Sequence, residues 1–473
     1  MVLKKVIFIE PKAPGYNIFS KFALPRLGSV LLATILENRG YETEVYFEER
    51  ERIDWNSVAS ADLIGISTIT STAPRAYMIA RRISRMGMPI VFGGPHPTFL
   101  PEEALDNGDF VIRGEGEETL LELIAALEGN GNLKEIKGLS YNCGGQKFHN
   151  PDRGLCENLD LLPEPNLKLI KGYKPASGFM VSKIVPVITS RGCPFHCNFC
   201  TVTQIFGRGY RFRSAQLVID EIKKYQGSHI FFYDDNFAAD KKRTKDLLRM
   251  MMEQNAVPAS WSGQVCIDVG RDEQLLGLMK KTNCDTLYIG IESINPKTLR
   301  LYHKAQSVEQ IVSGVKRIKE AGIRIHGMFV LGSDEDDIKV IRETLKFARK
   351  LGLETVQFMI LTPLPGSQVF STLKAQNKIF TYDWGLYDGQ HVVYRPSRMI
   401  PSVLQAEVFR TMKKFYSWQR VVKHFLKGEW TDMVIKGYAI LILNKWQKFN
   451  DDFKEKLRKG IYDKLSHRGE ISP

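Results

Sequence analysis

The pattern of hydrophobic and polar positions along the first part of the chain predicts alternating strands and helices. Short apolar runs typical of buried strands are separated by segments with an apolar residue every three or four positions, which is the helical spacing. The strand-like runs are 5–10, 44–47, 63–68, 89–94 and 110–113, and the helical patterns are 27–39, 73–86 and 117–127. This order predicts a parallel sheet with helices on both faces, so we expect an amino-terminal domain over residues 1–130.

The same alternation returns at residue 184 and continues to residue 370. Helical patterns such as 217–225, 242–254, 308–320 and 338–350 separate a second set of strand-like runs. These six runs are 187–190, 230–234, 260–267, 286–291, 323–330 and 355–361. Six β/α units are too few to close an eightfold barrel. The sequence therefore predicts a partial TIM-type (β/α)6 barrel over residues 184–370, with its chemistry at the carboxyl ends of the strands.

Two segments lack this alternation. Residues 131–183 are rich in Gly, Asn and Pro, and we expect a connector there. Residues 371–473 are helical in pattern and aromatic; their run 434–443 fits packing against the barrel, with a membrane-interface or lipid-binding helix as the alternative. The predicted fold class is α/β: a Rossmann-like (flavodoxin-like) domain, a connector, a partial barrel and a C-terminal helical region.

Length and cysteine content narrow the class of protein. A chain of 473 residues with 43% hydrophobic content can bury several cores, and its seven cysteines are too few and too unevenly spread for a disulfide framework. We therefore expect a reducing, cytoplasmic setting. The opening apolar run ends at Glu10–Pro11 without a small-residue cleavage site, which favours a first strand over a signal peptide. No apolar run approaches the roughly 20 residues needed to cross a bilayer.

Positive charge is concentrated near the end of the chain. The formal net charge is +13, and residues 401–473 hold 15 Lys and Arg against 8 Asp and Glu. A solvated basic helical face is the simplest explanation. Contact with an anionic surface, either a membrane or a nucleic acid, is the alternative.

Three cysteines follow the first strand of the expected barrel directly. Cys193, Cys197 and Cys200 stand at spacings of four and three. A loop with this spacing can wrap one iron–sulfur cubane, and because a four-iron cluster takes four ligands, one iron is left open for a small molecule. A zinc knuckle that lacks a ligand, or three unconnected buried thiols, are the alternatives. Cys266 and Cys284 lie in or near other strands and are interpreted as ordinary buried thiols.

At these residues the chain resembles the radical S-adenosylmethionine superfamily, whose signature is C-x3-C-x2-C with an aromatic residue before the last cysteine. The resemblance implies a 4Fe-4S cluster on the three cysteines and S-adenosylmethionine at the open iron. The S-adenosylmethionine contacts that it implies are Phe199, Asp234, Asp235, Glu292, Ser293, Gly327 and Leu361. Acids that follow apolar strands would need a cationic partner there. Asp235 could instead cap the next helix.

A parallel-sheet domain joined to such a barrel resembles the cobalamin-binding branch of that superfamily, and residues 93–98 and 109–117 match this branch. The positions that the resemblance places around cobalamin are Ser67, Thr68, Thr70, Gly93, Gly94, Pro95, His96, Gly114, Glu115 and Gly116. The Asp-x-His-x-x-Gly sequence that supplies a histidine ligand to cobalt does not occur in residues 1–130. Either the lower face of cobalt carries no histidine, or the domain no longer binds cobalamin.

The resemblance implies a 5'-deoxyadenosyl radical and methylation of an unactivated carbon in a lipid, tetrapyrrole or other secondary metabolite. Radical cyclisation or rearrangement of a tetrapyrrole-like substrate, or a non-catalytic cobalamin or redox sensor, are the alternatives. An RNA methylthiotransferase would bind nucleic acid, but those enzymes carry three further cysteines in the amino-terminal domain. Residues 1–130 of this chain contain no cysteine, so a nucleic acid partner is not expected. Expected partners are a small-molecule or lipid substrate and an electron donor such as flavodoxin or ferredoxin. Peripheral membrane contact through the C-terminal region and an anaerobic setting are further expectations.

Overall fold

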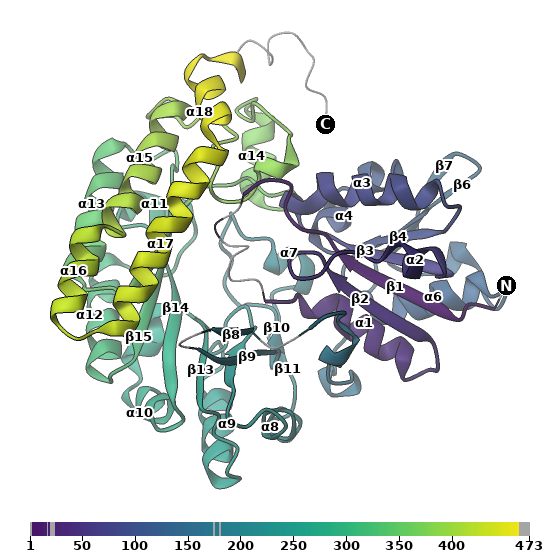
Figure 1. Ribbon diagram of the computed structural model, residues 1–473, viewed down its shortest axis with the longest axis horizontal. Helices are drawn as coiled ribbons and strands as arrows, with labels where there is room; N and C mark the ends of the chain where they lie inside the picture. Colours follow the sequence, from purple (N-terminus) through teal and green to yellow (C-terminus); the bar gives the residue numbers. More distant parts are fainter. Residues whose placement is uncertain (1, 17, 19–23, 174–175, 179–180, 463–473) are drawn as a thin grey trace. The chain divides into compact units, whose positions relative to one another are not determined.

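The computed structural model describes residues 2–16, 18, 24–173, 176–178 and 181–462 (Figure 1). These residues form two compact units. The described parts of unit 1 are 2–15, 24–173 and 201–211, and those of unit 2 are 16, 18, 176–178, 181–200 and 212–462. Each unit is built around a seven-stranded sheet.

The sheet of unit 1 has the strand order β2-β1-β3-β4-β5-β6-β7. Its first five strands are β1 (Lys5–Glu10), β2 (Glu42–Phe47), β3 (Leu63–Ser67), β4 (Ile90–Gly93) and β5 (Phe110–Ile112). They are parallel, and their order is that of the flavodoxin-like fold, which confirms the predicted fold class. In Figure 1, α3 (Ala73–Ser84) lies on one face of the sheet, and α1 (Leu27–Glu37) and α6 (Glu117–Leu127) lie on the other. Shorter helices are α2 (Trp55–Ala59), α4 (Pro95–Phe99), α5 (Pro101–Leu105) and α7 (Val202–Phe206).

The segment that we expected to be a connector extends this sheet. Strand β6 (Leu139–Cys143) pairs antiparallel with β5, and β7 (Gln146–His149) pairs antiparallel with β6. The turn between β6 and β7 is Gly144–Gly145, and both glycines have positive φ angles. A two-residue hairpin turn of this kind favours glycine. The glycine content that resembled a linker therefore belongs partly to a tight hairpin.

Unit 2 contains the expected partial barrel. Its sheet has the order β16-β15-β14-β13-β12-β9-β8, and the six strands from β9 to β16 are parallel. Their bounds are β9 (Val181–Val187), β12 (His229–Phe232), β13 (Ser260–Val265), β14 (Cys284–Glu292), β15 (Arg324–Leu331) and β16 (Thr355–Ile360). Strand β8 (Ala176–Gly178) is antiparallel to β9, while β10 (Ser190–Arg191) and β11 (Arg211–Phe212) lie outside this sheet. The (β/α)6 prediction is confirmed.

The helices between these strands follow the predicted spacing. They are α8 (Ala215–Lys223), α9 (Lys241–Glu253), α10 (Glu273–Lys281), α11 (Pro296–Leu301), α12 (Val308–Glu320) and α13 (Ile338–Lys350). Helix α12 begins with a capping box in which the Ser307 Oγ accepts from the Gln310 N–H and the Gln310 side chain accepts from the Ser307 N–H. Two of the orphan donors at this helix start are thereby satisfied.

A helical layer closes the open edge of the barrel sheet. It contains α14 (Gln368–Ala375), α15 (Pro401–Phe415), α16 (Trp418–Leu426), α17 (Trp430–Phe449) and α18 (Asp451–Arg458), and α15 contacts both β16 and α13. The Tyr416 hydroxyl accepts from the Val356 N–H at 2.8 Å and donates to the Val356 carbonyl at 2.7 Å. One side chain thus occupies the backbone groups that an edge strand would otherwise offer to another chain.

Two helical glycines of unit 2 allow a matched test of packing. A Cβ added to Gly314 in α12 would lie 2.7 Å from Ile267 Cγ1 and 3.0 Å from the Ile267 carbonyl oxygen, whereas one added to Gly277 in α10 would have no atom within 4 Å. We expect Gly314→Ala to lower the free energy of unfolding by about 1–3 kcal/mol through overpacking. Gly277→Ala should raise it by up to about 1 kcal/mol through helix propensity. Urea unfolding followed by circular dichroism measures both; shifts in the same direction would contradict this packing.

Candidate functional site

The cysteine loop begins at the carboxyl end of β9, where the resemblance places it. Gly192, with a φ of +89°, turns the chain into the loop, and Cys193, Cys197 and Cys200 are all half-buried. The Cys200 N–H donates to the Cys197 carbonyl at 3.1 Å, which closes a tight turn between the last two thiols.

The two acids that follow β12 hold the start of this loop. Asp234 Oδ1 accepts from the N–H groups of Thr189 (2.7 Å) and Ser190 (2.9 Å), and Asp234 Oδ2 accepts from the Thr189 hydroxyl at 2.5 Å. Asp235 Oδ2 accepts from the Gly192 N–H at 3.2 Å. Burial raises the pKa of Asp234, against the opposing effects of Arg243 and these hydrogen bonds, and burial raises the pKa of Asp235 to about 6. Both carboxylates therefore position the segment that leads into Cys193.

The other end of the loop is tied to two helices of unit 2. The Asn198 N–H donates to the Tyr302 carbonyl at 3.3 Å, and Asn198 Nδ2 donates to the Leu301 carbonyl at 2.7 Å. The rings of Phe199 and Tyr302 meet edge to face with their centroids 5.0 Å apart. At the start of α14, the Val369 N–H donates to the Asn198 carbonyl at 3.1 Å. Phe199 thus packs on the protein beside the cysteines.

The three thiols are not drawn together within reach of a single ion. Two sulfurs on the same zinc, each at about 2.3 Å from the metal, cannot be more than about 4.6 Å apart. Among the residues that the structure describes, only His424, Glu429 and Asp432 bring three potential ligand atoms within 4.8 Å of one another. At least one pair of the three thiols therefore exceeds the zinc limit. In this structure the three thiols are therefore not gathered around a single-ion position, whereas an iron–sulfur cluster spreads its ligands over several irons.

The buried amide of Asn236 and a fourth thiol, that of Cys266, lie near Cys193. Asn236 is buried, its Nδ2 lies 3.5 Å from Cys266 Sγ, and its Oδ1 has no hydrogen-bond partner in the described part of the chain. Burial raises the pKa of Cys193, while the Phe195 N–H and the Asn236 amide lower it. Cys266 is half-buried, and desolvation raises its pKa to about 12, which makes its thiol a poor nucleophile. An unsatisfied polar atom beside the cysteines indicates room for a polar group of a ligand.

A buried ion pair completes this cluster. Lys304 Nζ lies 3.0 Å from Glu292 Oε1, and the two side chains are 12% and 9% exposed. Burial lowers the pKa of Lys304, but the charge of Glu292 and the nearby Cys266 and Cys197 outweigh it, so the pKa is raised overall. The charge of Lys304 in turn acts to lower the pKa of Cys197 against its burial. Lys304 therefore stands between an acid and the thiols.

The backbone around Glu292 is shaped for this pair. Glu292 has a φ of +61°, a left-handed conformation that costs a non-glycine residue free energy, and it follows a register shift in the pairing of β14 with β15. A Cβ at Gly290 would lie 2.3 Å from Glu292 Oε1 and 3.0 Å from Lys304 Nζ. Glycine at this position leaves the space that the ion pair fills.

Three further positions implied for S-adenosylmethionine lie at or within other strands of the barrel sheet: Ser293, Leu361 and Gly327. Ser293 is buried, and its Oγ accepts from the Asn295 N–H at 3.0 Å. Leu361 follows β16 at the carboxyl edge, where its N–H donates to the Leu331 carbonyl at 2.9 Å. Gly327 lies in the middle of β15, and its missing Cβ points at Leu353 Cδ1, 2.7 Å away. Glycine there serves close packing on the helix side of the sheet.

In unit 1, the ends of β3 and β4 are drawn together by a glycine turn. Gly94 has a φ of +94°, and a Cβ there would lie 2.7 Å from the Thr68 carbonyl oxygen and 3.3 Å from Ser67 Oγ. The Thr68 N–H donates to the Gly93 carbonyl at 2.9 Å, and the His96 N–H donates to the Thr68 carbonyl at 3.3 Å. Thr70 is buried in the single 3-10 turn that follows, η2 (Thr70–Thr72).

Thr98 links this turn to the next one along the sheet. Its hydroxyl donates to the Gly94 carbonyl at 2.8 Å and accepts from the Gly114 N–H at 3.1 Å. A Cβ at Gly93 or Gly114 would meet no atom within 4 Å. Glycines that face open space at the carboxyl ends of β4 and β5 leave room for a large ligand to approach the backbone.

Two implied cobalamin contacts have protein partners. His96 follows Pro95 in α4, its ring is fully buried, and its Nε2 lies 3.3 Å from Glu103 Oε1. Glu115, which precedes Gly116, is paired at both carboxylate oxygens with the guanidinium of Arg211, each at 2.9 Å, and also accepts from the Cys156 N–H at 2.7 Å. Its carboxylate ties three segments of unit 1 together.

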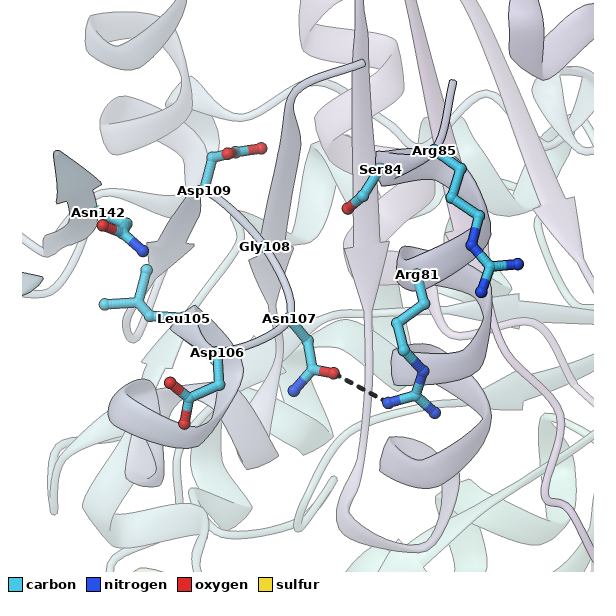
Figure 2. Close-up of a pocket in the computed structure, with 9 residues that line it drawn as sticks. All are labelled: Arg81, Ser84, Arg85, Leu105, Asp106, Asn107, Gly108, Asp109 and Asn142. Carbon is cyan, nitrogen blue, oxygen red and sulfur yellow. Dashed lines mark hydrogen bonds between the residues drawn. The ribbon is translucent and has the colours of Figure 1, made fainter. Parts of the chain in front are cut away.

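A cavity of about 350 Å³ in unit 1 lies at the opposite edge of the sheet. Figure 2 shows it between Arg81, Ser84 and Arg85, at the end of α3, and Asp106, Asn107 and Asp109, which precede β5. These segments stand at the amino ends of β4 and β5. Ligands of open α/β sheets bind beyond the carboxyl ends, and this cavity lies at the other edge, away from the glycines that follow β4 and β5.

Signals in the sequence for Lys304 and Asn236 were weak. Lys304 stands alone after a short helix, and only the fold brings it to Glu292, 12 positions earlier. Asn236 directly follows Asp234 and Asp235 after β12. An amide at that place is also common in turns.

Comparison with known proteins gives the same two-part picture. The model of the radical SAM superfamily matches residues 187–348, and the model of the B12 binding domain matches residues 17–124. An uncharacterized methyltransferase of Pyrococcus horikoshii is 32% identical over 82% of this chain and 86% of its own length. The bacteriochlorophyllide d C-12(1)-methyltransferase of Chlorobaculum tepidum is 25% identical, over 89% of each chain. Among solved structures, the cobalamin-dependent S-adenosylmethionine radical enzyme OxsB with aqua-cobalamin bound shares the fold, with a TM-score of 0.67 and 16% identity over 99% of this chain and 82% of that one.

Proposed function

The chain belongs to the cobalamin-binding branch of the radical S-adenosylmethionine enzymes, and we propose that it methylates an unactivated carbon of a lipid, tetrapyrrole or other secondary metabolite. Enzymes of this kind use a 4Fe-4S cluster, S-adenosylmethionine and cobalamin. The observation that carries the proposal is the braced loop of three half-buried thiols beside the buried Glu292–Lys304 pair. The name of the C. tepidum relative supports a tetrapyrrole as one substrate class.

Cys193, Cys197 and Cys200 are the proposed cluster ligands. Asp234 and Asp235 act on the cluster indirectly, because their oxygens already hold Thr189, Ser190 and Gly192. We therefore propose that both position the loop, in place of the contacts with S-adenosylmethionine that the resemblance implied for Asp234 and Asp235. Asn236 Oδ1, which lacks a partner in the described chain, is the better acceptor for a donor on the bound ligand.

Glu292 and Lys304 are the proposed pair for the amino acid part of S-adenosylmethionine. Its ammonium group complements Glu292, and its carboxylate complements Lys304. A buried pair of opposite charges offers both complements at once and needs little rearrangement. Phe199, Ser293, Gly327 and Leu361 stay proposed neighbours of the same ligand; Gly327 and Ser293 would act through backbone shape.

Ser67, Thr68, Thr70, Gly93, Gly94, Gly114 and Gly116 are the proposed lining of the cobalamin site. The donors and glycines at the ends of β3, β4 and β5 fit a large ligand whose face must come close to the backbone. Pro95, His96 and Glu115 support this lining from behind, since His96 is buried against Glu103 and Glu115 is held by Arg211. We propose that no histidine of unit 1 ligates cobalt.

When bound, the three groups supply an electron, an adenosyl radical source and a transferable methyl group. The chain's own residues bind and orient them. Lys304 and Glu292 keep charge paired in a site with little water, and the acids after β12 fix the entry to the cysteine loop. A small-molecule or lipid substrate and a reductant such as flavodoxin or ferredoxin are the proposed partners. No helix in the described part of the chain is long and apolar enough to cross a membrane.

The cysteine assignment predicts a selective loss of iron. Alanine at Cys193, Cys197 or Cys200 should reduce iron and sulfide from about four of each per chain toward zero, because each removes a ligand of the cluster. Cys266→Ala and Cys284→Ala are the matched controls and should keep both. Metal and sulfide analysis of anaerobically reconstituted protein measures this. Iron loss from Cys266→Ala equal to that from Cys200→Ala would refute the assignment.

If Glu292 and Lys304 bind S-adenosylmethionine, single and double variants should affect protein stability and ligand affinity differently. Lys304→Met leaves a buried carboxylate unpaired and should destabilise the protein by about 3–5 kcal/mol. The double variant Glu292→Gln, Lys304→Met should recover much of that loss but bind S-adenosylmethionine at least about tenfold more weakly, since hydrogen bonds to charged groups contribute about 1.5–3 kcal/mol.

Thermal unfolding and equilibrium dialysis of reconstituted protein measure the two effects. Lys316→Met, from the exposed pair with Glu320, whose side chains are 75% and 59% exposed, should change neither. Binding of S-adenosylmethionine by the double variant at the affinity of the unaltered protein would remove the pair from the site.

Anaerobic incubation with methyl-labelled S-adenosylmethionine, dithionite, cobalamin and cell extract tests the function itself. We expect 5'-deoxyadenosine together with a labelled product heavier by a methylene group. An unlabelled product with changed bonding would indicate cyclisation or rearrangement instead. Complete absence of 5'-deoxyadenosine from cluster-loaded protein would indicate a sensor.

A further inference from the structure

An exposed apolar ridge runs along two C-terminal helices of unit 2. On α16 the exposed fractions are 60% for Trp418, 54% for Val422, 51% for Phe425 and 77% for Leu426. On α17 they are 54% for Trp430 and 44% for Val434. No residue of α16, all of which is described, is buried. We define these six residues as the ridge.

The ridge is continuous because its members repeat at helical spacing and meet at the turn. Trp418, Val422 and Phe425 stand at i, i+4 and i+7 on one face of α16, and Trp430 and Val434 stand at i and i+4 on α17. The rings of Phe425 and Trp430 meet edge to face with their centroids 5.4 Å apart. The two helices contact each other, and Figure 1 shows them as neighbours in the C-terminal layer. Leu441, 62% exposed, extends the α17 face.

Positive charge borders this ridge. Residues 417–448 contain six Lys and Arg, of which Lys436 is fully buried and Arg420 is half-buried, against two Asp and Glu. Both acids are engaged locally: Glu429 Oε2 lies 2.5 Å from His424 Nδ1, and Asp432 Oδ1 lies 3.5 Å from Lys436 Nζ. Lys423 and Lys427, which flank the apolar side chains on α16, are exposed. Neither of these two acids is therefore paired with Lys423 or Lys427.

We propose that this ridge is a docking surface for an anionic lipid bilayer. Tryptophan, phenylalanine and leucine on one face with lysine at its margins is the composition of a helix that lies in a membrane interface. A twofold contact between two copies of the chain would bring the lysines of both copies together, whereas anionic headgroups neutralise them. The helices rest on the interface and do not cross it, in keeping with the absence of a spanning helix among the described residues. The proposal does not depend on the radical chemistry.

Co-sedimentation of the full-length, cluster-loaded protein with sucrose-loaded vesicles tests it. One set of vesicles is phosphatidylcholine alone, and the other is phosphatidylcholine and phosphatidylglycerol in equal parts. We expect binding to the second set that falls with added salt, and little binding to the first. Lys423→Ala with Lys427→Ala should weaken binding on the order of tenfold to thirtyfold, at about 1 kcal/mol per lysine.

A matched pair of variants separates the ridge from exposed apolar surface in general. Leu426→Glu, at a residue 77% exposed, should weaken vesicle binding at least about tenfold, whereas Leu161→Glu, at a residue 78% exposed in unit 1, should leave it unchanged. Both variants should keep the circular dichroism spectrum and the yield of 5'-deoxyadenosine of the unaltered protein, so that loss of docking is distinguishable from loss of the site.

Three outcomes would overturn the proposal. They are no binding to anionic vesicles, equal binding to neutral ones, and equal loss of binding in the Leu161 and Leu426 variants. A concentration-dependent dimer in sedimentation velocity that Leu426→Glu abolishes, together with unchanged vesicle binding, would instead assign the ridge to contact between copies.

Discussion

The hydrogen bonds from Thr189, Ser190 and Gly192 to the carboxylates after β12 are the constraint from which the site follows. They join the end of β9 to its neighbour in the sheet, directly before Cys193. A cysteine loop without its metal has little of its own to hold it, and an uncompensated buried carboxylate would be costly. These hydrogen bonds satisfy both requirements. The two carboxylates gain hydrogen-bond donors, and the loop is held by two parallel strands.

One charged side chain likewise interacts with several groups around the thiols. A single ammonium group, Lys304, offsets Glu292 and lies near Cys197 and Cys266. Glu292 reaches it from a left-handed backbone conformation that glycine at 290 leaves room for. Conformational cost concentrated beside a reactive cluster is characteristic of functional sites, where the surrounding fold maintains the unfavourable geometry.

Local patterns in the sequence predicted the two parallel sheets, the six-stranded barrel and the cysteine loop, because strand alternation and motif spacing are properties of neighbouring residues. The sequence could not show that Asp234 would be occupied by backbone donors, or that His96 would be buried against Glu103. Those outcomes depend on contacts between segments far apart in the chain. The β6–β7 hairpin was missed for another reason: its glycine turn has the composition of a linker.

The pairing of Arg211 with Glu115 has a consequence for how the two units are connected. Arg211 follows the cysteine loop by 11 positions, yet it belongs with residues 201–211 to unit 1, while the chain on either side belongs to unit 2. The polypeptide thus passes between the units repeatedly, and neither is a contiguous fragment. A truncation after residue 173 would isolate the crevice domain without the arginine that neutralises its buried glutamate. Unit 1 therefore depends on a residue that lies beyond the cysteine loop in the sequence.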